Sequence, residues 1–445
     1  MYNIMERYIK ILLLLAIIPI GCADLDDPQP VNSISTEFAI IDRSSANAAL
    51  NGVYSDLQDG TLAFDGWLAL AQYFSDETVF TGTFPTRLEF GNFNVFPANG
   101  TMAAVFSDFY EVINRANNVI AIVPTLEDET FTPEDRNDVM AQARFIRAQC
   151  YLHMVTLWQD IPLVLMPTVD VGDVLQVPTS SVDAIYAQVI EDFSFAQANL
   201  FNTTSLFRAS QQAATAFLAR VALYNGDFGQ AFGLATQALA GVDFTSVPYL
   251  QDQIYSLNFT PTDGNSLAFF YGPAEFGARH SIEPSPDLIS AYEDGDARFN
   301  LSVDVGSASV PFGIKYPSFA DANAGAATDP IFFIRHAEMV LIAAEAAAEL
   351  GDFGEANTFF NMIRARVGLA PLELDATNYI DLILQERFVE LAMEGPHRLL
   401  DLRRTGRALD VLGGLGYDPC DDIWPLPQRD IDRNPNLNQN GCCNC

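Results

Sequence analysis

Positively charged residues are scarce in this sequence. Its 445 residues include 57 Asp and Glu against 23 Lys and Arg, which gives a formal net charge of -34 at pH 7. A charge of this sign repels nucleic-acid phosphates and anionic lipid head groups. The acidic residues are scattered along the chain rather than gathered in a tail. The composition therefore argues strongly against nucleic-acid binding and indicates a well-solvated acidic surface.

Motifs typical of catalysis are also missing. The chain has no nucleophile elbow, phosphate-binding loop or dinucleotide fingerprint. Its four histidines, at positions 153, 280, 336 and 397, have no metal-binding spacing relative to one another. We therefore expect no catalytic residues, no metal site and no cofactor. Because paired carboxylates could occur anywhere in so acidic a chain, a glycoside hydrolase on a helical fold remains an alternative.

The first residues are typical of an export signal. Arg7 and Lys10 precede an apolar stretch over residues 11–20, which is too short to span a bilayer as a helix. Gly21 and Cys22 follow directly and resemble a bacterial lipobox, although Pro19 departs from the usual leucine. We predict a lipoprotein signal peptide over residues 1–21, acylation at Cys22, and an acylated linker over residues 22–35. Two or three acyl chains would anchor the protein stably to a membrane.

The remaining cysteines are compatible with an exported protein. Cys150 lies in an apolar helical stretch and is predicted to be a buried thiol. Cys420 and the terminal Cys442, Cys443 and Cys445 could form disulfides or belong to an idle tail, and a metal site is the alternative.

Apolar residues recur at helical spacing through most of the chain, while strand-like alternation is scarce. We predict helices over residues 102–123, 133–158, 181–200, 210–223, 229–239, 331–350, 354–367 and 378–393. Two helix pairs share a turn sequence, Gly-Asp-Phe-Gly-Gln-Ala at 226–231 and Gly-Asp-Phe-Gly-Glu-Ala at 351–356. These turns are tetratricopeptide-like, with a glycine that ends one helix and a small alanine that lets the next approach closely. The predicted fold class is mainly all-α, a tetratricopeptide-like helical repeat scaffold.

Two stretches interrupt the helical pattern. Residues 76–100 and 242–329 are rich in Gly, Pro, Asn, Asp and aromatic residues and show little periodicity. They are predicted to be long loop excursions laid over the scaffold. Long ordered loops in compact domains usually carry function.

Six sequence blocks, in order along the chain, resemble the SusD/RagB family of outer-membrane nutrient-binding lipoproteins. The most specific is residues 385–395 (QERFVELAMEG) followed by 398–406 (RLLDLRRTG). The others are residues 110–120 (YEVINRANNVI), 143–151 with 158–163 (ARFIRAQCY, WQDIPL), 333–346 (FIRHAEMVLIAAEA), 361–368 (NMIRARVG) and 423–428 with 434–440 (IWPLPQ, NPNLNQN). The acidic residues after Cys22 are similar to the surface-export tag of Bacteroidetes lipoproteins.

The resemblance implies a function as well as a fold. It implies a single SusD-like domain over residues 36–445, on a protein held at the cell-surface side of the outer membrane by its lipid anchor alone. Members capture oligo- or polysaccharide and pass it to a SusC-like TonB-dependent transporter, without catalysis. Some relatives serve peptide importers, so a peptide-binding surface lipoprotein is a further alternative.

Charged residues in these blocks alternate at helical offsets. They are predicted to form a partly buried ion-pair network that fixes helix packing rather than a catalytic site. The residues concerned are Arg147, Arg335, Glu338, Glu345, Glu386, Arg387, Glu390, Glu394, Arg398, Asp401, Arg403 and Arg404.

Sugar recognition needs flat apolar faces for pyranose rings and planar polar groups for hydroxyls, and loops offer both. Family members bind glycan on a face built from the two interrupting regions. We therefore predict glycan-binding residues there: Asp76, Phe84, Arg87, Phe93, Asn94 and Phe96 in the first, and Tyr271, Phe276, Arg279, Tyr292, Tyr316 and Phe319 in the second. The negative charge favours a neutral glycan, although bound structural calcium could reverse that preference.

Overall fold

The computed structural model describes residues 39–168, 172 and 176–440. The predicted signal peptide, the linker, Cys22 and the cysteines at 442, 443 and 445 lie outside these residues. From Asp42 onward the chain forms one compact unit. No helix in the described part of the chain has both the length and the apolar character needed to cross a membrane.

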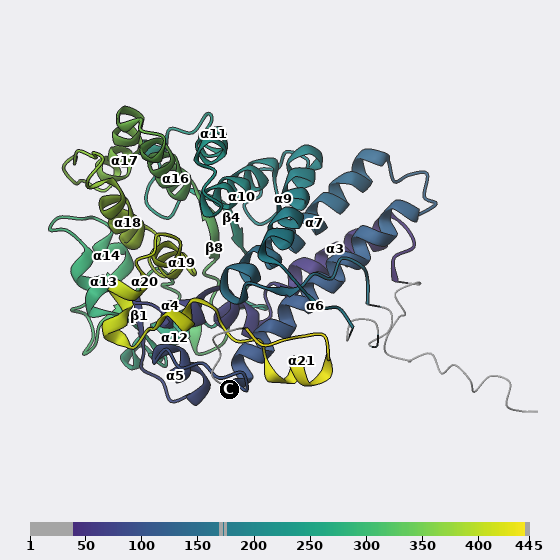
Figure 1. Ribbon diagram of the computed structural model, residues 1–445, viewed down its shortest axis with the longest axis horizontal. Helices are drawn as coiled ribbons and strands as arrows, with labels where there is room; N and C mark the ends of the chain where they lie inside the picture. Colours follow the sequence, from purple (N-terminus) through teal and green to yellow (C-terminus); the bar gives the residue numbers. More distant parts are fainter. Residues whose placement is uncertain (1–38, 169–171, 173–175, 441–445) are drawn as a thin grey trace, which may run out of the picture. The chain divides into compact units, whose positions relative to one another are not determined.

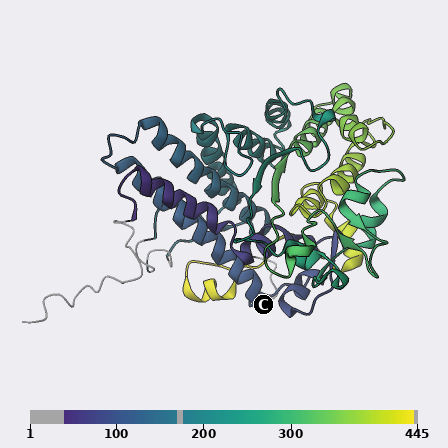
Figure 2. The same cartoon turned by 180° about the vertical axis from the view of Figure 1, so that it is seen from behind.

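Helices make up most of this unit, as predicted (Figure 1). The longer ones are α3 (Arg43–Asp56), α6 (Gly100–Ile122), α7 (Pro133–Trp158), α9 (Val182–Asn199), α10 (Gln211–Tyr224), α11 (Phe228–Ala238), α16 (His336–Glu349), α17 (Phe353–Arg366), α18 (Tyr379–Glu390) and α19 (His397–Arg404). Neighbours along the chain pack on one another from α6 through α7, α9, α10 and α11, and then α11 packs on α16 and α16 on α17. Figures 1 and 2 show this succession, with α3, α6 and α7 at one side and α17 and α18 at the other.

Both predicted repeat turns are present. Gly226 and Gly351 adopt positive φ angles of 71° and 82°, which glycine reaches without strain. The aspartate that follows each glycine caps the next helix through its side chain, Asp227 on α11 and Asp352 on α17. The alanines at 231 and 356 are fully buried between the paired helices.

Short elements lie between and beside the longer helices. They comprise a π-helical turn η1 (Leu62–Ala69), α4 (Leu70–Tyr73), β1 (Thr78–Phe80), α5 (Pro85–Gly91), β2 (Ile161–Pro162), β3 (Thr179–Ser180), β4 (Gln253–Leu257), α12 (Leu267–Tyr271), β5 (Ile282–Pro284), α13 (Pro286–Ala291), α14 (Phe299–Ser302), β6 (Val303–Asp304), β7 (Phe312–Gly313), α15 (Phe319–Ala322), α20 (Ala408–Leu412) and α21 (Gln428–Arg433). The strands form four antiparallel pairs. β1 with β5 and β4 with β8 (Ile331–Arg335) join distant parts of the chain, whereas β2 with β3 and β6 with β7 join nearby segments.

One helix prediction is wrong at its start. Residues 331–335 form the strand β8 (Ile331–Arg335), and the helix begins only at His336. β8 pairs with β4, with Ile331 opposite Leu257. All five side chains are buried, and the β-branched and aromatic residues among them suit a strand covered on both faces.

The predicted ion-pair network is present and deeply buried. Arg335 bonds the carboxylates of Asp252, Glu390 and Glu394, and Arg298 bonds those of Asp296, Glu386 and Glu390. The other predicted members pair as Arg147–Asp192, Arg220–Glu338, Arg387–Asp401, Arg398–Asp76 and Arg404 with Glu345 and Asp401. Arg403 is the exception, since it bonds the Tyr417 hydroxyl and the Asp421 carbonyl instead.

Cys150 is fully buried, as predicted, and burial raises the pKa of its thiol. This thiol is therefore packed as a small apolar side chain and stays protonated.

Candidate binding groove

A surface groove of about 610 Å³ lies between residues 59–65 with Arg87 on one side and part of the second interrupting region on the other. One wall comes from η1 and α5, and the other from α12 and the segment after α15. Its lining residues are Asp59, Gly60, Thr61, Phe64, Asp65, Arg87, Asn265, Ser266, Phe269, Phe270, Asn323 and Gly325. This volume is within the usual range for small-molecule sites.

Aromatic rings form the apolar part of the groove. Phe64 of η1 and Phe270 of α12 stack with ring centroids 4.2 Å apart and an interplanar angle of 28°. Phe269 meets Phe270 edge to face at 5.3 Å. Phe269 and Phe270 are only partly buried, because Leu267, Ala268 and Tyr271 on the same short helix face the core. The groove thus presents flat apolar surface at a water-accessible position.

Arg87 is fixed at the centre of these rings. Its Nε and Nη2 atoms donate to the two carboxylate oxygens of Asp65 at 2.8 and 2.7 Å, while its Nη1 atom makes no hydrogen bond to any described residue. The guanidinium carbon lies 5.1 Å from the Phe64 ring centroid and 5.2 Å from that of Phe270. The guanidinium is therefore held rigidly, with donor capacity left for a ligand.

Burial dominates the electrostatics of this pair. Desolvation raises the pKa of the Asp65 carboxyl, and the hydrogen bonds and charge of Arg87 lower it in part. Asp65 in turn contributes to raising the pKa of Arg87. The carboxylate needs this guanidinium to remain ionised in a buried position.

Further aromatic side chains lie on the exposed rim beside the groove. Phe84 is 39% exposed, and the guanidinium of Arg279 lies 4.5 Å from its ring centroid while that of Arg87 lies 4.8 Å away. Phe276, which is 42% exposed, contacts the rings of Phe312 and Phe319 at 5.6 and 6.0 Å. Phe84 and Arg279, from different interrupting regions, thus meet at the rim.

Two glycine positions allow the close backbone approach that shapes the second wall. A Cβ atom on Gly264 would collide with the carbonyl oxygen of Gly325, so the two chain segments meet only because position 264 has no side chain. Gly277 has a φ of 82°, and a Cβ there would lie 2.8 Å from the Asn323 amide nitrogen. A smaller hollow of about 180 Å³ adjoins the groove and shares Phe64, Asn265 and Gly325 with it.

The predicted glycan-binding residues divide into three groups. Arg87 lines the groove, and Phe84, Phe276, Arg279 and Phe319 belong to the aromatic clusters beside it. Asn94, Phe96 and Tyr292 do not line it, and the Tyr292 hydroxyl donates to the Val389 carbonyl.

Four residues of the prediction are corrected by burial. Asp76 is 6% exposed and accepts two hydrogen bonds from Arg398, and Phe93 packs against Phe74 and Tyr417. Tyr271 donates to Gln72 and Tyr316 donates to the Met393 carbonyl, both within the core. A side chain enclosed by protein cannot stack on a sugar ring, so these four are part of the core. By the same criterion Phe64, which is 2% exposed, backs the Phe270 ring rather than offering a face of its own.

Sequence reasoning missed Phe64, Asp65, Phe269, Phe270, Asn265 and Asn323. A signal was available for two of them. Residues 267–271 read Leu-Ala-Phe-Phe-Tyr, and a short helix can bury only one side of such a run. Phe269 and Phe270 were thus as good candidates as the tyrosine beside them.

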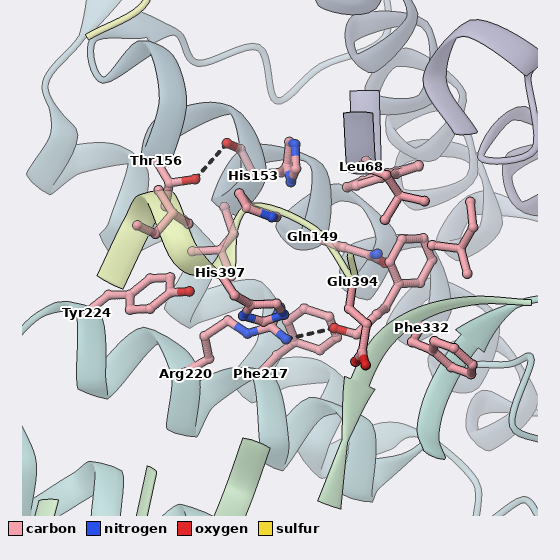
Figure 3. A pocket seen from close by; sticks show the side chains of 16 residues that line it. Leu68, Gln149, His153, Thr156, Phe217, Arg220, Tyr224, Phe332, Glu394 and His397 are labelled. Atoms are coloured by element: carbon pink, nitrogen blue, oxygen red, sulfur yellow. Dashed lines mark hydrogen bonds between the residues drawn. The ribbon is translucent and has the colours of Figure 1, made fainter. Parts of the chain in front are cut away.

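A second cavity lies inside the unit and is too small for a sugar. It has a volume of about 40 Å³ and is lined by Trp67, Gln149, His153, Arg220 and His397, among others (Figure 3). Burial lowers the pKa of His153 and of His397 to about 4, so both are neutral at pH 7. Trp67 Nε1, His397 Nδ1 and both amide atoms of Gln149 find no hydrogen-bond partner among the described residues. Such a polar space suits a few ordered waters.

Comparison with known proteins decides the family. A family model described as the SusD family matches residues 313–418, and a second, described as starch-binding associating with outer membrane, matches residues 86–223. SusD-like protein P2 of Formosa agariphila is 26% identical over 98% of this chain and 99% of its own length. This chain is a SusD-like protein. SusD-like protein P38 of the same organism is 25% identical over 94% of this chain and 95% of its own length.

Solved structures of SusD-like proteins share the fold. A SusD superfamily protein from Bacteroides vulgatus aligns over 90% of this chain and 98% of its own, with a TM-score of 0.80 and 20% identity. A laminarin-binding SusD-like protein aligns over 90% of this chain and 99% of its own, with a TM-score of 0.78 and 23% identity. The mainly α-helical SusD-like fold predicted from the sequence is thereby confirmed.

Proposed function

We propose that this SusD-like protein binds an oligo- or polysaccharide in the groove between η1, α5 and α12 and delivers it to a SusC-like TonB-dependent transporter. The observation that supports the proposal best is the arrangement around Arg87. A fixed guanidinium with an available donor lies among the rings of Phe64, Phe84 and Phe270, in an open groove of about 610 Å³.

This arrangement matches what a sugar offers chemically. The C–H faces of a pyranose ring pack on aromatic rings, and its hydroxyls accept from Arg87 Nη1 and exchange hydrogen bonds with the amide of Asn323. The Asn323 side chain is exposed and forms no hydrogen bond to the rest of the described chain. Because binding displaces ordered water from these groups, we expect modest affinity for each sugar unit.

A neutral glycan is the favoured ligand. The charge of Arg87 is neutralised by Asp65, and Asp59 adds a negative charge to the lining. An anionic polysaccharide would also meet the net charge of -34 on the whole chain. Laminarin is the first glycan to test, because a structural neighbour is described as laminarin-binding.

The lipid anchor and the transporter partner are inferred from the resemblance to the family and from the N-terminal sequence. We propose that Cys22 carries the lipid anchor, that the protein faces the medium at the outer membrane, and that it has no catalytic activity. The second family model is described by its association with the outer membrane, and SusD-like structural neighbours are described as carbohydrate-binding. Replacing Cys22 by Ser should move the protein from the membrane fraction to the soluble fraction.

The binding proposal is tested by affinity electrophoresis in gels containing laminarin, starch, alginate or pectin, with reducing ends measured in parallel. We expect retardation by a neutral glycan without new reducing ends. Phe270→Ala and Arg87→Ala should reduce it strongly, whereas Phe207→Ala, an exposed aromatic outside the groove, should keep it. New reducing ends would identify a glycoside hydrolase, and no retardation in any gel would favour peptide capture.

Co-purification tests the partner. Membranes of the native host, solubilised in mild detergent, should yield the protein together with a TonB-dependent outer-membrane transporter. Purification of the lipid-anchored protein alone under conditions that preserve membrane complexes would contradict the delivery role.

A further inference from the structure

A second groove, separate from the first, lies between the end of α7, the start of α9 and α19. Its volume is about 340 Å³, and its polar lining includes Gln159, Tyr186, Tyr224, Arg403, Arg404 and Asp422. None of its lining residues belongs to the groove around Arg87.

Three side chains offer hydrogen-bonding groups to this second groove. The hydroxyls of Tyr186 and Tyr224 and the amide of Gln159 form no hydrogen bond to any other described residue, and each of these side chains is partly exposed. Burial raises the pKa of Tyr224 to about 12 and also raises that of Tyr186, so both hydroxyls stay protonated and can donate. The two phenol rings add flat apolar surface beside these donors.

Two arginines are held rigidly in the same wall. Arg403 donates from Nη2 to the Asp421 carbonyl at 2.6 Å, and Arg404 donates from Nε to Asp401 at 2.9 Å and from Nη2 to Glu345 at 2.8 Å. Planar polar groups fixed by the fold lose little entropy when a ligand binds. The groove is therefore organised before any ligand arrives.

Gln159 adopts a backbone conformation that glycine would favour. It ends α7 with a φ of 58° and a ψ of -108°. A non-glycine residue held in such a region stores strain, and strain of this kind is found most often at functional positions. The strained position carries one of the three available side chains of the groove.

The second groove continues into a neighbouring hollow. Tyr224 and Arg404 also line a space of about 260 Å³ that extends to Tyr379 and Arg407. Tyrosine and arginine are, with tryptophan, the residue types enriched at the hot spots of protein–protein interfaces. The two adjoining spaces offer a ligand more contact surface than either alone.

From these observations we propose that the groove around Tyr186 and Arg403 is a second saccharide-binding site for the same class of neutral glycan. This inference rests on the proposed glycan-binding function. The carboxylates of Asp401, Glu345 and Asp422 balance the arginines, so the site is not built for an anion. Two sites on one protein would hold a long polysaccharide by more than one contact and raise its overall affinity over that of a short oligosaccharide.

The test uses two variants of Gln159 and Tyr186. Gln159→Gly removes the side chain at a backbone position that suits glycine, so its melting temperature should equal or exceed that of the natural protein. Tyr186→Phe removes only a hydroxyl. Each should weaken retardation by long laminarin about three- to tenfold, the factor expected for one lost hydrogen bond. Phe201→Ala, which removes an exposed aromatic after α9, is the matched control and should change nothing.

Calorimetry with a laminarin oligosaccharide separates the two proposals. With Phe270→Ala disabling the first groove, residual binding should persist, and it should weaken about three- to tenfold further in Phe270→Ala/Gln159→Gly. If Phe270→Ala alone abolishes all binding and Gln159→Gly is neutral in the natural background, the second site is refuted while the glycan-binding function stands. If the natural protein binds no glycan by gel or calorimetry, the proposed function itself fails.

Discussion

Replacing Arg87 by Ala should both destabilise the fold and weaken glycan binding, because Arg87 pairs with Asp65 and faces the groove. Asp65 is 3% exposed, and Arg87 supplies both of its side-chain hydrogen bonds among the described residues. Removing one partner of a buried ion pair costs about 3 to 5 kcal/mol. The side of Arg87 that faces the groove meets water, so we expect a cost around the lower end of this range, about 2 to 4 kcal/mol at pH 7. In a chain of this length that corresponds to a fall in melting temperature of about 2 to 5 °C.

The penalty should depend on pH in a defined direction. Desolvation already raises the pKa of Asp65, and loss of Arg87 removes the group that lowers it. An acid whose folded-state pKa lies above its unfolded value destabilises the fold at higher pH, and protonation relieves the cost. The difference in unfolding free energy between Arg87→Ala and the natural protein should therefore shrink as pH falls through the pKa of Asp65.

The double variant Arg87→Met/Asp65→Leu completes the design. Replacing both partners by apolar residues of similar size removes the unpaired charge, so stability should return close to that of the natural protein. Glycan retardation should stay well below that of the natural protein, because no donor is left among the rings. Urea titrations and affinity gels measure the two properties separately. If the double variant binds glycan as well as the natural protein does, Arg87 does not contact the ligand and the proposed role of this groove is refuted.

Three further predictions test the rest of the structure. Glu394→Gln weakens the buried ion pairs with Lys315 and Arg335 and should lower the free energy of unfolding by about 3 kcal/mol. Asp381→Asn removes an exposed ion pair with Arg407 and should cost less than about 1 kcal/mol. Urea titration measures both changes. Phe276→Ala should weaken glycan affinity about two- to tenfold by calorimetry, and no change would remove the rim from the site. Burial raises the pKa of Glu77 from 4.5 to about 8, so between pH 4.5 and about pH 8 the folded protein binds a proton that the unfolded chain has lost. The stability of the fold should therefore decrease as the pH rises from 4.5 to about 8. Glu77→Gln should make the melting temperature depend less on pH in this range.

The helical scaffold was predictable because its signals are local. α7 spans residues 133–158, as the spacing of apolar residues predicts, with Thr132 as its cap and Pro133 at its first position. β8 was missed because its five buried residues fit either a helix or a covered strand. Residues 331–335 form a strand because they pair with β4, almost eighty residues earlier in the chain. The local spacing of apolar residues gives no information on so distant a partner.

The candidate groove overlaps the two predicted regions unequally. Its second wall lies within residues 242–329, whereas only Arg87 of its first wall lies within residues 76–100. The sequence also could not tell which aromatic side chain faces water. In α12 the core takes Tyr271 and leaves Phe269 and Phe270 outside. Asp76 illustrates the same limit, since its partner Arg398 lies 322 residues further along the chain.

The pairing of distant segments also determines when this protein can finish folding. β1 pairs with β5, and Asp76 accepts hydrogen bonds from Arg398. The Glu77 carboxyl group accepts a hydrogen bond from the backbone N–H of Met393. The first interrupting region therefore depends on contacts with residues near the end of the chain. Contacts between such distant segments carry a high entropic cost and slow folding. The segment around β1 therefore forms late, after nearly the whole polypeptide is available. A chain that ends before residue 393 should lose the ordered packing around residues 76–80, although the missing part lies more than 300 positions away in sequence.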